Sequence, residues 1–190
     1  NSLGLIISST YLLATLAFKG IAHYKVAEAL EKNNIEHKDI NTRATYFNSI
    51  LWSAQIELED SYMFTYYSLF DKSMPVFTKK FPKNHDMLKP FIGEKKIQQL
   101  IILSNGHYIM SNENDELIFW NLKLGQKGFD KNASPYIWSY VIEKNNKEQI
   151  QLDETNEKMD AIKVEEIRSF RNNRKYSEEF SKFYERLKGI

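Results

Sequence analysis

Residues Asn41–Asp71, NTRATYFNSILWSAQIELEDSYMFTYYSLFD, decide the fold, because they hold two runs rich in β-branched and aromatic side chains. The runs are Ile50–Leu58 and Tyr62–Phe70, and the acidic stretch Glu57–Asp60 marks the break between them. Such runs on either side of a short polar turn are typical of an antiparallel β-hairpin. We therefore predict a hairpin here as the centre of a sheet.

Both faces of the second run are apolar or aromatic. Alternation along a strand places Tyr62, Phe64 and Tyr66 on one face, and Met63 and Tyr67 on the other. Neither face is polar enough to lie in solvent, so we expect a helix to cover one of them and another surface or a ligand cleft to cover the second. Core packing is the simpler interpretation. The alternative is a ligand-binding face, for which the candidate residues are Trp52, Tyr66 and Trp120.

The composition is that of an ordinary globular domain without cysteine chemistry. The chain has 190 residues, of which 42% are apolar and 27% are charged, so one domain is the expected organisation. A net charge of +1 argues against general nucleic-acid binding, which needs a clustered cationic surface. The lack of cysteine excludes disulfides, thiolate metal sites and a cysteine nucleophile.

The first 33 residues are predicted to form a long helix with two different parts. Leu3–Phe18 carries no charge, although serine and threonine interrupt its apolar sequence. From Phe18 onward the apolar residues fall at helical spacing, with lysine and glutamate between them. One interpretation is a helix that packs on the sheet. The other makes the first part the end of a membrane helix or a stalk close to a membrane. The start at Asn1 rather than methionine suggests a piece of a longer protein.

The remaining elements are predicted from turn residues and periodicity. We expect a linker at His37–Thr45 and an irregular connection at Lys72–Ile92, with at most a short strand at Val76–Phe77. A helix at Glu94–Ser104 should end at Asn105–Gly106, and it should be followed by a hairpin of His107–Ser111 and Glu116–Leu124 and by a strand pair of Tyr136–Glu143 and Gln149–Leu152. Two helical segments should end the chain, the first marked by Met159, Ile162, Ile167 and Phe170 and the second by Tyr176, Phe180, Phe183 and Leu187.

This order of elements predicts an α+β fold. We expect a mainly antiparallel sheet of about five to seven strands, with a long N-terminal helix, one central helix and a C-terminal helical segment. The predicted organisation is an N-terminal helix or membrane-proximal link at residues 1–33, a sheet domain at 34–155 with the inserted helix 94–104, and helices at 156–190 that pack on the same domain.

Three pieces of the chain carry a family resemblance. They are Asn48–Trp52 with the later Ser68–Asp71, then Ser104–Tyr108, and then Phe119–Gly125. In this order they resemble the domain that follows the transmembrane part of the YdjM-type (LexA-regulated) family of membrane-bound, metal-dependent hydrolases. The third piece departs from the family's aspartate-leucine-arginine-aromatic-glycine pattern, because asparagine, lysine and leucine replace the aspartate, arginine and aromatic residue.

The resemblance implies an extramembrane C-terminal domain of a bacterial inner-membrane protein. Its partners would be transmembrane helices upstream in the same protein. Any divalent metal and its histidine and aspartate ligands would belong to that upstream part, which has no counterpart in these residues. The domain would then support or regulate the membrane part without being catalytic itself. Alternative functions are a module that binds a ligand, peptide or lipid on its aromatic sheet face, and a self-sufficient hydrolase that uses acidic residues.

The residues themselves give no catalytic, cofactor or metal site. No two of the histidines lie three or four positions apart, so no helix face offers a pair of imidazole ligands. Ser68 lacks the glycine-flanked turn of a serine nucleophile, and Ser104 is better explained by the end of a helix. The glycines are not grouped as a phosphate-binding loop requires. The histidines are His23, His37, His85 and His107.

The proline-rich connection is locally basic. Between Asp71 and Lys96 there are seven lysines and three acidic residues. The simpler interpretation is a solvated loop, and the alternative is a patch that faces an anionic membrane surface. The candidate residues for this patch are Lys79, Lys80, Lys83 and Lys89.

Overall fold

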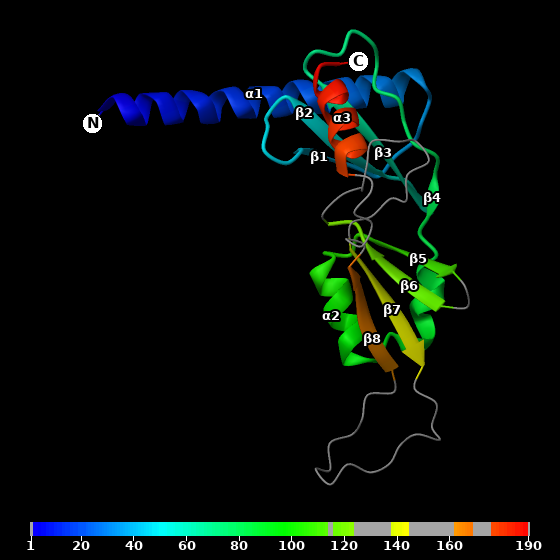
Figure 1. Ribbon diagram of the computed structural model, residues 1–190. Helices are drawn as coiled ribbons and strands as arrows, with labels where there is room; N and C mark the ends of the chain where they lie inside the picture. Colours follow the sequence, from blue (N-terminus) through cyan, green and yellow to red (C-terminus); the bar gives the residue numbers. More distant parts are fainter. Residues whose placement is uncertain (1, 114–115, 124–137, 145–161, 169–175, 190) are drawn as a thin grey trace. The chain divides into compact units, whose positions relative to one another are not determined.

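The computed structural model describes residues 2–113, 116–123, 138–144, 162–168 and 176–189. The chain divides into two compact units. Residues 2–81 and 176–189 belong to the first unit, and the described residues from 82 to 168 belong to the second. Each unit has its own antiparallel sheet and its own helix over that sheet (Figure 1). The predicted α+β class is therefore confirmed, with two four-stranded sheets in place of the single sheet that we expected.

The sheet of the first unit has the strand order β1-β2-β3-β4. Its centre is the predicted hairpin, with β2 at Leu51–Glu57 and β3 at Ser61–Ser68, and it pairs Leu51 with Ser68. Strand β1 (Asp39–Ala44) pairs with β2 along its whole length, so the predicted linker at His37–Thr45 is wrong. Only Thr42 of this edge strand is buried, which is why its sequence lacks a strand pattern.

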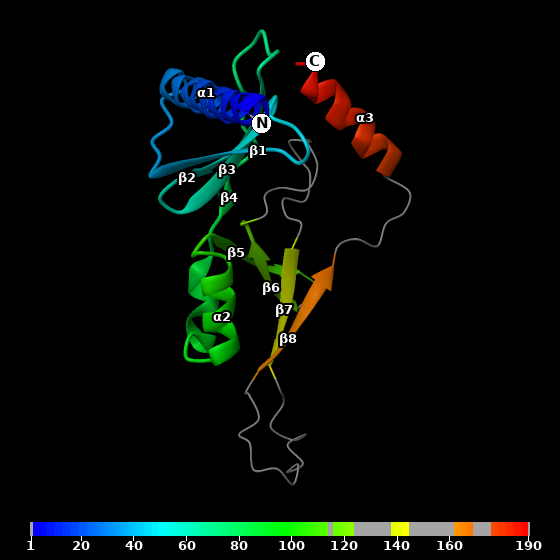
Figure 2. The same ribbon diagram turned by 90° about the vertical axis from the view of Figure 1, so that its left-hand side faces the viewer.

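Two helices lie on opposite sides of this sheet (Figure 2). Helix α1 (Ser2–Lys32) packs Val26 and Leu30 against Ile56 and Met63, which confirms that a helix covers one face. Helix α3 (Tyr176–Leu187) lies on the other side, as the second predicted C-terminal segment. The short strand β4 (Phe81–Pro82) replaces the one expected at Val76–Phe77, where the backbone instead bonds to β3 through Thr78.

The second unit is built around the second predicted hairpin, with β5 at Tyr108–Glu113 and β6 at Glu116–Asn121. The 3-10 helix η1 (His85–Phe91) and helix α2 (Lys95–Leu103) contribute to its core. The turn after α2 is as predicted, because Asn105 and Gly106 take positive φ angles of 55° and 79°. The buried residues of this core are Leu88, Ile97, Leu100, Tyr108, Met110, Phe119, Tyr140 and Ile142.

The last two strands correct the predicted C-terminal part. Strand β7 (Trp138–Lys144) matches the predicted strand at Tyr136–Glu143 within the described residues. Its neighbour is β8 (Ile162–Arg168), so the predicted helical segment marked by Ile162 and Ile167 is wrong. The segment holds three β-branched residues in seven, and antiparallel pairing with β7 fixes it as a strand. The strand expected at Gln149–Leu152 lies outside the described residues.

Candidate functional site

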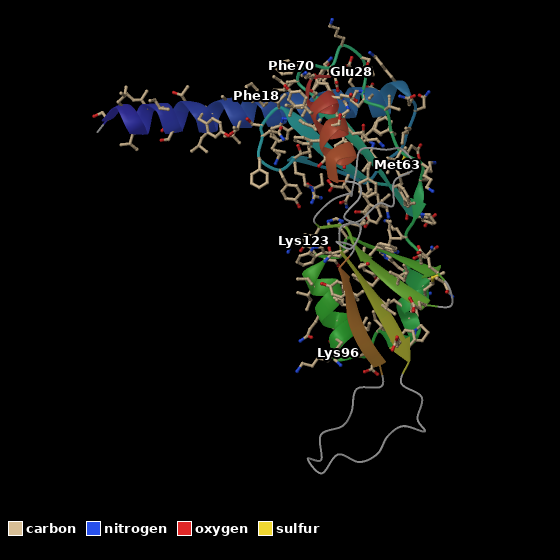
Figure 3. The ribbon with its side chains drawn as sticks, viewed as in Figure 1. Phe18, Glu28, Met63, Phe70, Lys96 and Lys123 are labelled. Atoms are coloured by element: carbon tan, nitrogen blue, oxygen red, sulfur yellow. The ribbon has the colours of Figure 1, made fainter. Side chains whose placement is uncertain are left out.

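Helix α1 is packed over only half of its length. In its C-terminal half, residues 18–32, Ala22, Val26, Ala29 and Leu30 are at most 1% exposed and lie against the first sheet. The outer face of this packed half is charged, and Glu28 accepts hydrogen bonds from two lysines, at 2.9 and 3.0 Å. Figure 3 shows Phe18 at the point where the helix leaves the sheet and Glu28 further along. The packed half thus has the pattern of an ordinary amphipathic surface helix.

The N-terminal half of α1, residues 2–17, projects beyond the sheet (Figure 1). It contains no charged residue, and none of its residues is buried. Eight large apolar or aromatic side chains of this projecting half are 60–71% exposed. They are Leu3, Leu5, Ile6, Ile7, Tyr11, Leu12, Leu13 and Leu16.

These exposed side chains surround the projecting half rather than lining one face. Successive residues of an α-helix are rotated by about 100°, so the eight positions are spread around the whole circumference. A groove in a protein partner would select one apolar stripe, as the sheet does in the packed half. A helix that is apolar on every side is typical of a protein interior or a membrane. The projecting half is not in the interior of this structure.

The projecting half is shorter than a complete membrane span. Residues 2–17 cover about 24 Å at a rise of about 1.5 Å per residue, against about 30 Å of hydrocarbon in a bilayer, so this half can enter a bilayer without crossing all of it. Helix α1 satisfies the length and composition of a membrane-spanning helix, and only 6% of its most apolar stretch is buried inside the structure. Two other kinds of helix can have similar length and composition: the core helix of a soluble protein, which is mostly buried, and a signal sequence near an N-terminus.

Two of the hydroxyl groups in the projecting half bond to the helix itself. Ser8 Oγ donates to the carbonyl oxygen of Leu5 at 3.1 Å, and Thr15 Oγ1 donates to that of Leu12 at 2.8 Å. A hydroxyl group that donates to the backbone of its own helix has a hydrogen-bond partner, so the free-energy cost of placing it in an apolar environment is lower. These interruptions in the apolar sequence are therefore compatible with lipid.

The structure does not bring the three candidate ligand-face residues together. Trp52 is buried against Ala22 of α1, and its Nε1 donates to the carbonyl oxygen of Ser49 at 3.1 Å. Tyr66 lies on the opposite face of the same sheet, where burial raises the pKa of its phenol above the usual range. Trp120 belongs to the second sheet, and its Nε1 donates to Ser111 Oγ at 2.7 Å. A ligand face made by all three residues therefore stays a prediction without geometric support.

The candidate basic residues are divided between the two units. Lys79 and Lys80 belong to the first unit, and Lys83 and Lys89 to the second. Lys79 Nζ lies 5.4 Å from the centre of the Phe81 ring. Lys89 Nζ lies 2.8 Å from Asp86 Oδ1, in an exposed ion pair. The membrane-facing patch stays a prediction, because the four lysines do not belong to one unit.

Residues of the first resembling piece anchor α3. The Arg186 guanidinium forms two hydrogen bonds with the Asp71 carboxylate, at 2.5 and 2.6 Å, and a third with the carbonyl oxygen of Tyr66 at 2.7 Å. Ser68 Oγ donates to the carbonyl oxygen of Leu187 at 2.6 Å. Ser68 therefore has a structural role here. The sequence carried no local signal for Arg186, which is 115 residues from its partner.

The chain also comes very close to β3 just beyond α3. Gly189 has a φ of 78°, and a Cβ atom at this position would lie 2.6 Å from the carbonyl group of Phe70. Glycine alone fits both the backbone angle and the space. This close approach supports the anchor made by Arg186.

Three of the four histidines make identified hydrogen-bond contacts. His23 Nδ1 lies 3.2 Å from Thr42 Oγ1, His37 Nδ1 lies 3.3 Å from the carbonyl oxygen of Ile35, and His85 Nε2 lies 2.9 Å from that of Tyr108. Within the described residues, no three histidine or acidic side chains are grouped as a metal ion requires. The expected lack of a metal or cofactor in this chain stays a prediction.

No protein-family model matches the chain, and no curated protein or solved structure is detectably similar to it. The resemblance to the YdjM-type family therefore stays a prediction, and the function is argued from the geometry of α1.

Proposed function

We propose that this chain is a membrane-attached, non-catalytic domain, with the projecting half of α1 in the lipid bilayer and the first sheet at the membrane surface. The observation that carries the proposal is the contrast within one continuous helix. One half is apolar on all sides and bare, and the other is amphipathic and packed. Lipid is the environment that matches the bare half, because exposing so much apolar surface to water is unfavourable.

The continuity of α1 gives the domain its physical role. The helix passes from the projecting half into the packed half without a break. A helix fixed in a bilayer would therefore determine where the first sheet stands above the membrane. Combined with the resemblance to membrane-bound, metal-dependent hydrolases, this arrangement favours a domain that supports or regulates a membrane-embedded part of the same protein.

Two serines that we considered as nucleophiles have other bonds. The hydroxyl of Ser68 donates to the backbone of α3, and that of Ser104 donates to the carbonyl oxygen of Ile101 at 2.9 Å. Ser104 is also fully buried. These contacts support a structural role for both residues.

Flotation with phosphatidylcholine vesicles tests the membrane attachment. We expect the chain to float with the vesicles after reconstitution from detergent. The double variant Leu5→Lys/Leu12→Lys should stay in the aqueous fraction, because each lysine costs about 2.5–3.5 kcal/mol at the centre of a membrane helix. Its circular dichroism and melting temperature should not change, because both side chains are exposed.

The matched control places two lysines on another exposed apolar helix face. Ile102 and Leu103 of α2 are 76% and 42% exposed, so Ile102→Lys/Leu103→Lys should fold and float as the parent chain does. The proposal is wrong if the Leu5→Lys/Leu12→Lys variant floats equally well, or if the parent chain remains with the aqueous fraction.

The proposed supporting role also predicts what the gene encodes upstream of Asn1. We expect several apolar spans that contain histidine and aspartate upstream of Asn1. A reading frame that encodes a soluble segment there would contradict this role, while the flotation result would still decide membrane attachment.

A further inference from the structure

We propose that the loop between β1 and β2, residues 45–50, together with Phe70, forms a second contact with the membrane interface beside α1. The inference rests on the proposed function and adds which surface of the first unit faces the lipid headgroups. Its strongest sign is Phe47, whose side chain is fully exposed at 106%.

Phe47 is held in an unusual backbone conformation. Its φ is 59°, in the left-handed region that disfavours residues with a bulky side chain. The other three non-glycine residues with positive φ in the described part of the chain are Asn34, Asn84 and Asn105. Asparagine is the residue type that tolerates this conformation best after glycine. A solvent-exposed phenylalanine at such a position suggests that its ring contacts something other than this domain.

The loop that presents Phe47 is well ordered by hydrogen bonds. Asn48 Oδ1 accepts from the backbone N–H groups of Ile50 and Leu51, at 2.9 and 2.7 Å. Asn48 Nδ2 donates to Thr45 Oγ1 at 2.7 Å and to the carbonyl oxygen of Tyr46 at 3.1 Å. The exposed position of the ring is therefore set by a defined loop structure.

The packing of α1 shows that this loop lies where the projecting half begins. Leu30 packs near Ile56 and Leu58, toward the turn between β2 and β3. Phe18 packs near Trp52, toward the loop between β1 and β2. From Leu30 to Phe18 the helix thus runs toward this loop, and the projecting half continues past it. Figure 1 shows the loop beside α1 at the base of the projecting half.

Phe70 lies at the same end of the sheet. It follows Ser68, which pairs with Leu51 at the start of β2, and its side chain is 58% exposed. Tyr46 is also exposed, at 61%, and its ring centre lies 6.5 Å from that of Phe47. This end of the first unit therefore presents three exposed rings around the base of an apolar helix.

The chemistry of these groups suits the boundary between lipid and water. Tyrosine is favoured at the headgroup level, because its ring is apolar and its hydroxyl is polar. Phenylalanine has no polar group, and its ring can enter the apolar side of the boundary between headgroups and acyl chains. Lys19 and Lys72 are exposed at the same end, next to Phe18 and Asp71 in sequence. Lysine is favoured at this depth because its stem is apolar and its ammonium group can reach the headgroups.

The lack of native cysteine allows single labels to report depth. We would attach an environment-sensitive fluorophore at Tyr46→Cys, at Leu12→Cys in α1, and at Asp60→Cys, an exposed position in the turn between β2 and β3 at the other end of the first sheet. Each labelled full chain would be reconstituted into phosphatidylcholine vesicles that carry quenchers at the headgroup or deep in the acyl chain. We expect the label at 12 to be quenched mainly by the deep quencher, the label at 46 by the headgroup quencher, and the label at 60 by neither.

The outcomes separate the two proposals. If the label at 12 is not quenched, the membrane segment itself is wrong, and the loop contact fails with it. If the label at 12 is quenched and the label at 46 behaves as the label at 60 does, the proposed function stands and the loop contact is overturned. That second result would assign the exposed rings to a protein partner instead.

A second variant separates membrane contact from folding. Phe47→Asn keeps a residue that accepts the left-handed conformation, so the melting temperature should be unchanged or higher. In this background we expect headgroup quenching at position 46 to fall about two-fold or more, because the ring no longer enters the interface. Phe47→Trp should keep the quenching of the parent chain. A loss of thermal stability in Phe47→Asn, or full quenching in that variant, would overturn the inference.

Discussion

The two halves of α1 belong to one regular helix but are suited to different environments. The packed half has a buried stripe and a charged outer face, and it fits a helix between a sheet and water. The projecting half has no stripe, because apolar side chains extend from it in every direction. The projecting half carries no charge, whereas the packed half contains lysine and glutamate. The distribution of apolar residues around the axis also distinguishes the two halves, and it indicates which surroundings each half requires.

The largest expected difference between the halves concerns folding stability. Leu30→Ala should lower the free energy of unfolding by about 2–5 kcal/mol, because it leaves a cavity against the sheet. Leu12→Ala, the same substitution in the projecting half, should change it by less than about 0.5 kcal/mol. Chemical denaturation in detergent-free buffer or mild detergent measures both. Equal losses would mean that the projecting half is also packed.

Membrane attachment should be independent of the anchor on the other side of the sheet. Arg186→Ala leaves the nearly buried Asp71 carboxylate without its guanidinium, and the free energy of unfolding should fall by about 2–4 kcal/mol. Flotation with vesicles should be unchanged, because α3 takes no part in it. The control is Lys188→Ala, at an exposed residue whose Nζ lies over the Tyr184 ring. Loss of flotation in Arg186→Ala alone would show that the two helices are coupled.

The boundary between the halves can be located at Phe18. This side chain is half-buried at the edge of the Trp52 cluster, so Phe18→Ala should cost about 1–2 kcal/mol of unfolding free energy, less than Leu30→Ala. Leu16→Ala, two residues earlier, should cost almost nothing, because this side chain is exposed. A cost at Leu16 as large as that at Phe18 would move the boundary toward the N-terminus. Thermal melts of both variants provide the measurement.

The smallest expected effect compares two threonines. Thr42 is buried and lies within hydrogen-bond distance of His23, so Thr42→Val should lower the free energy of unfolding by about 1 kcal/mol. Thr15 bonds only to the backbone of its own turn, so Thr15→Val should change stability in water by less than about 0.5 kcal/mol. The valine should also strengthen vesicle binding slightly. Weaker binding in Thr15→Val would contradict a lipid environment for this residue.

The elements that the sequence predicted correctly are those with a strong local pattern. The hairpin of β2 and β3 combines alternation with a high content of aromatic residues, and α2 combines helical spacing with Asn105 and Gly106 at its end. Strand β1 lacked such a pattern, because an edge strand is fixed by pairing more than by burial. The apolar residues of β8 fitted helical spacing as well as a strand, and short apolar segments are ambiguous in this way.

The candidate site was predictable only in part. The uncharged stretch Leu3–Phe18 raised the membrane interpretation, but the alternative of packing on the sheet fitted the same residues. In the structure the C-terminal half packs on the sheet and the N-terminal half is exposed. Composition distinguished the two parts, but it could not show which of them packs. Phe47 gave no signal in the sequence, because a left-handed backbone angle and full exposure depend on the hydrogen bonds of Asn48. The sequence analysis also missed the division into two units. The apolar residues of the two cores do not differ in type, so the sequence does not show which core each residue joins.

The link between Asp71 and Arg186 has a consequence for the order of events during synthesis. The second unit is inserted into the first, so α3, which closes the first unit, leaves the ribosome only after the whole of the second unit. The second unit can fold while the first unit is still incomplete. The N-terminal helix can enter a bilayer before the folding of the first or the second unit is complete. A nascent chain stalled before Arg186 emerges would thus contain a folded second unit within a first unit that still lacks its contact with α3.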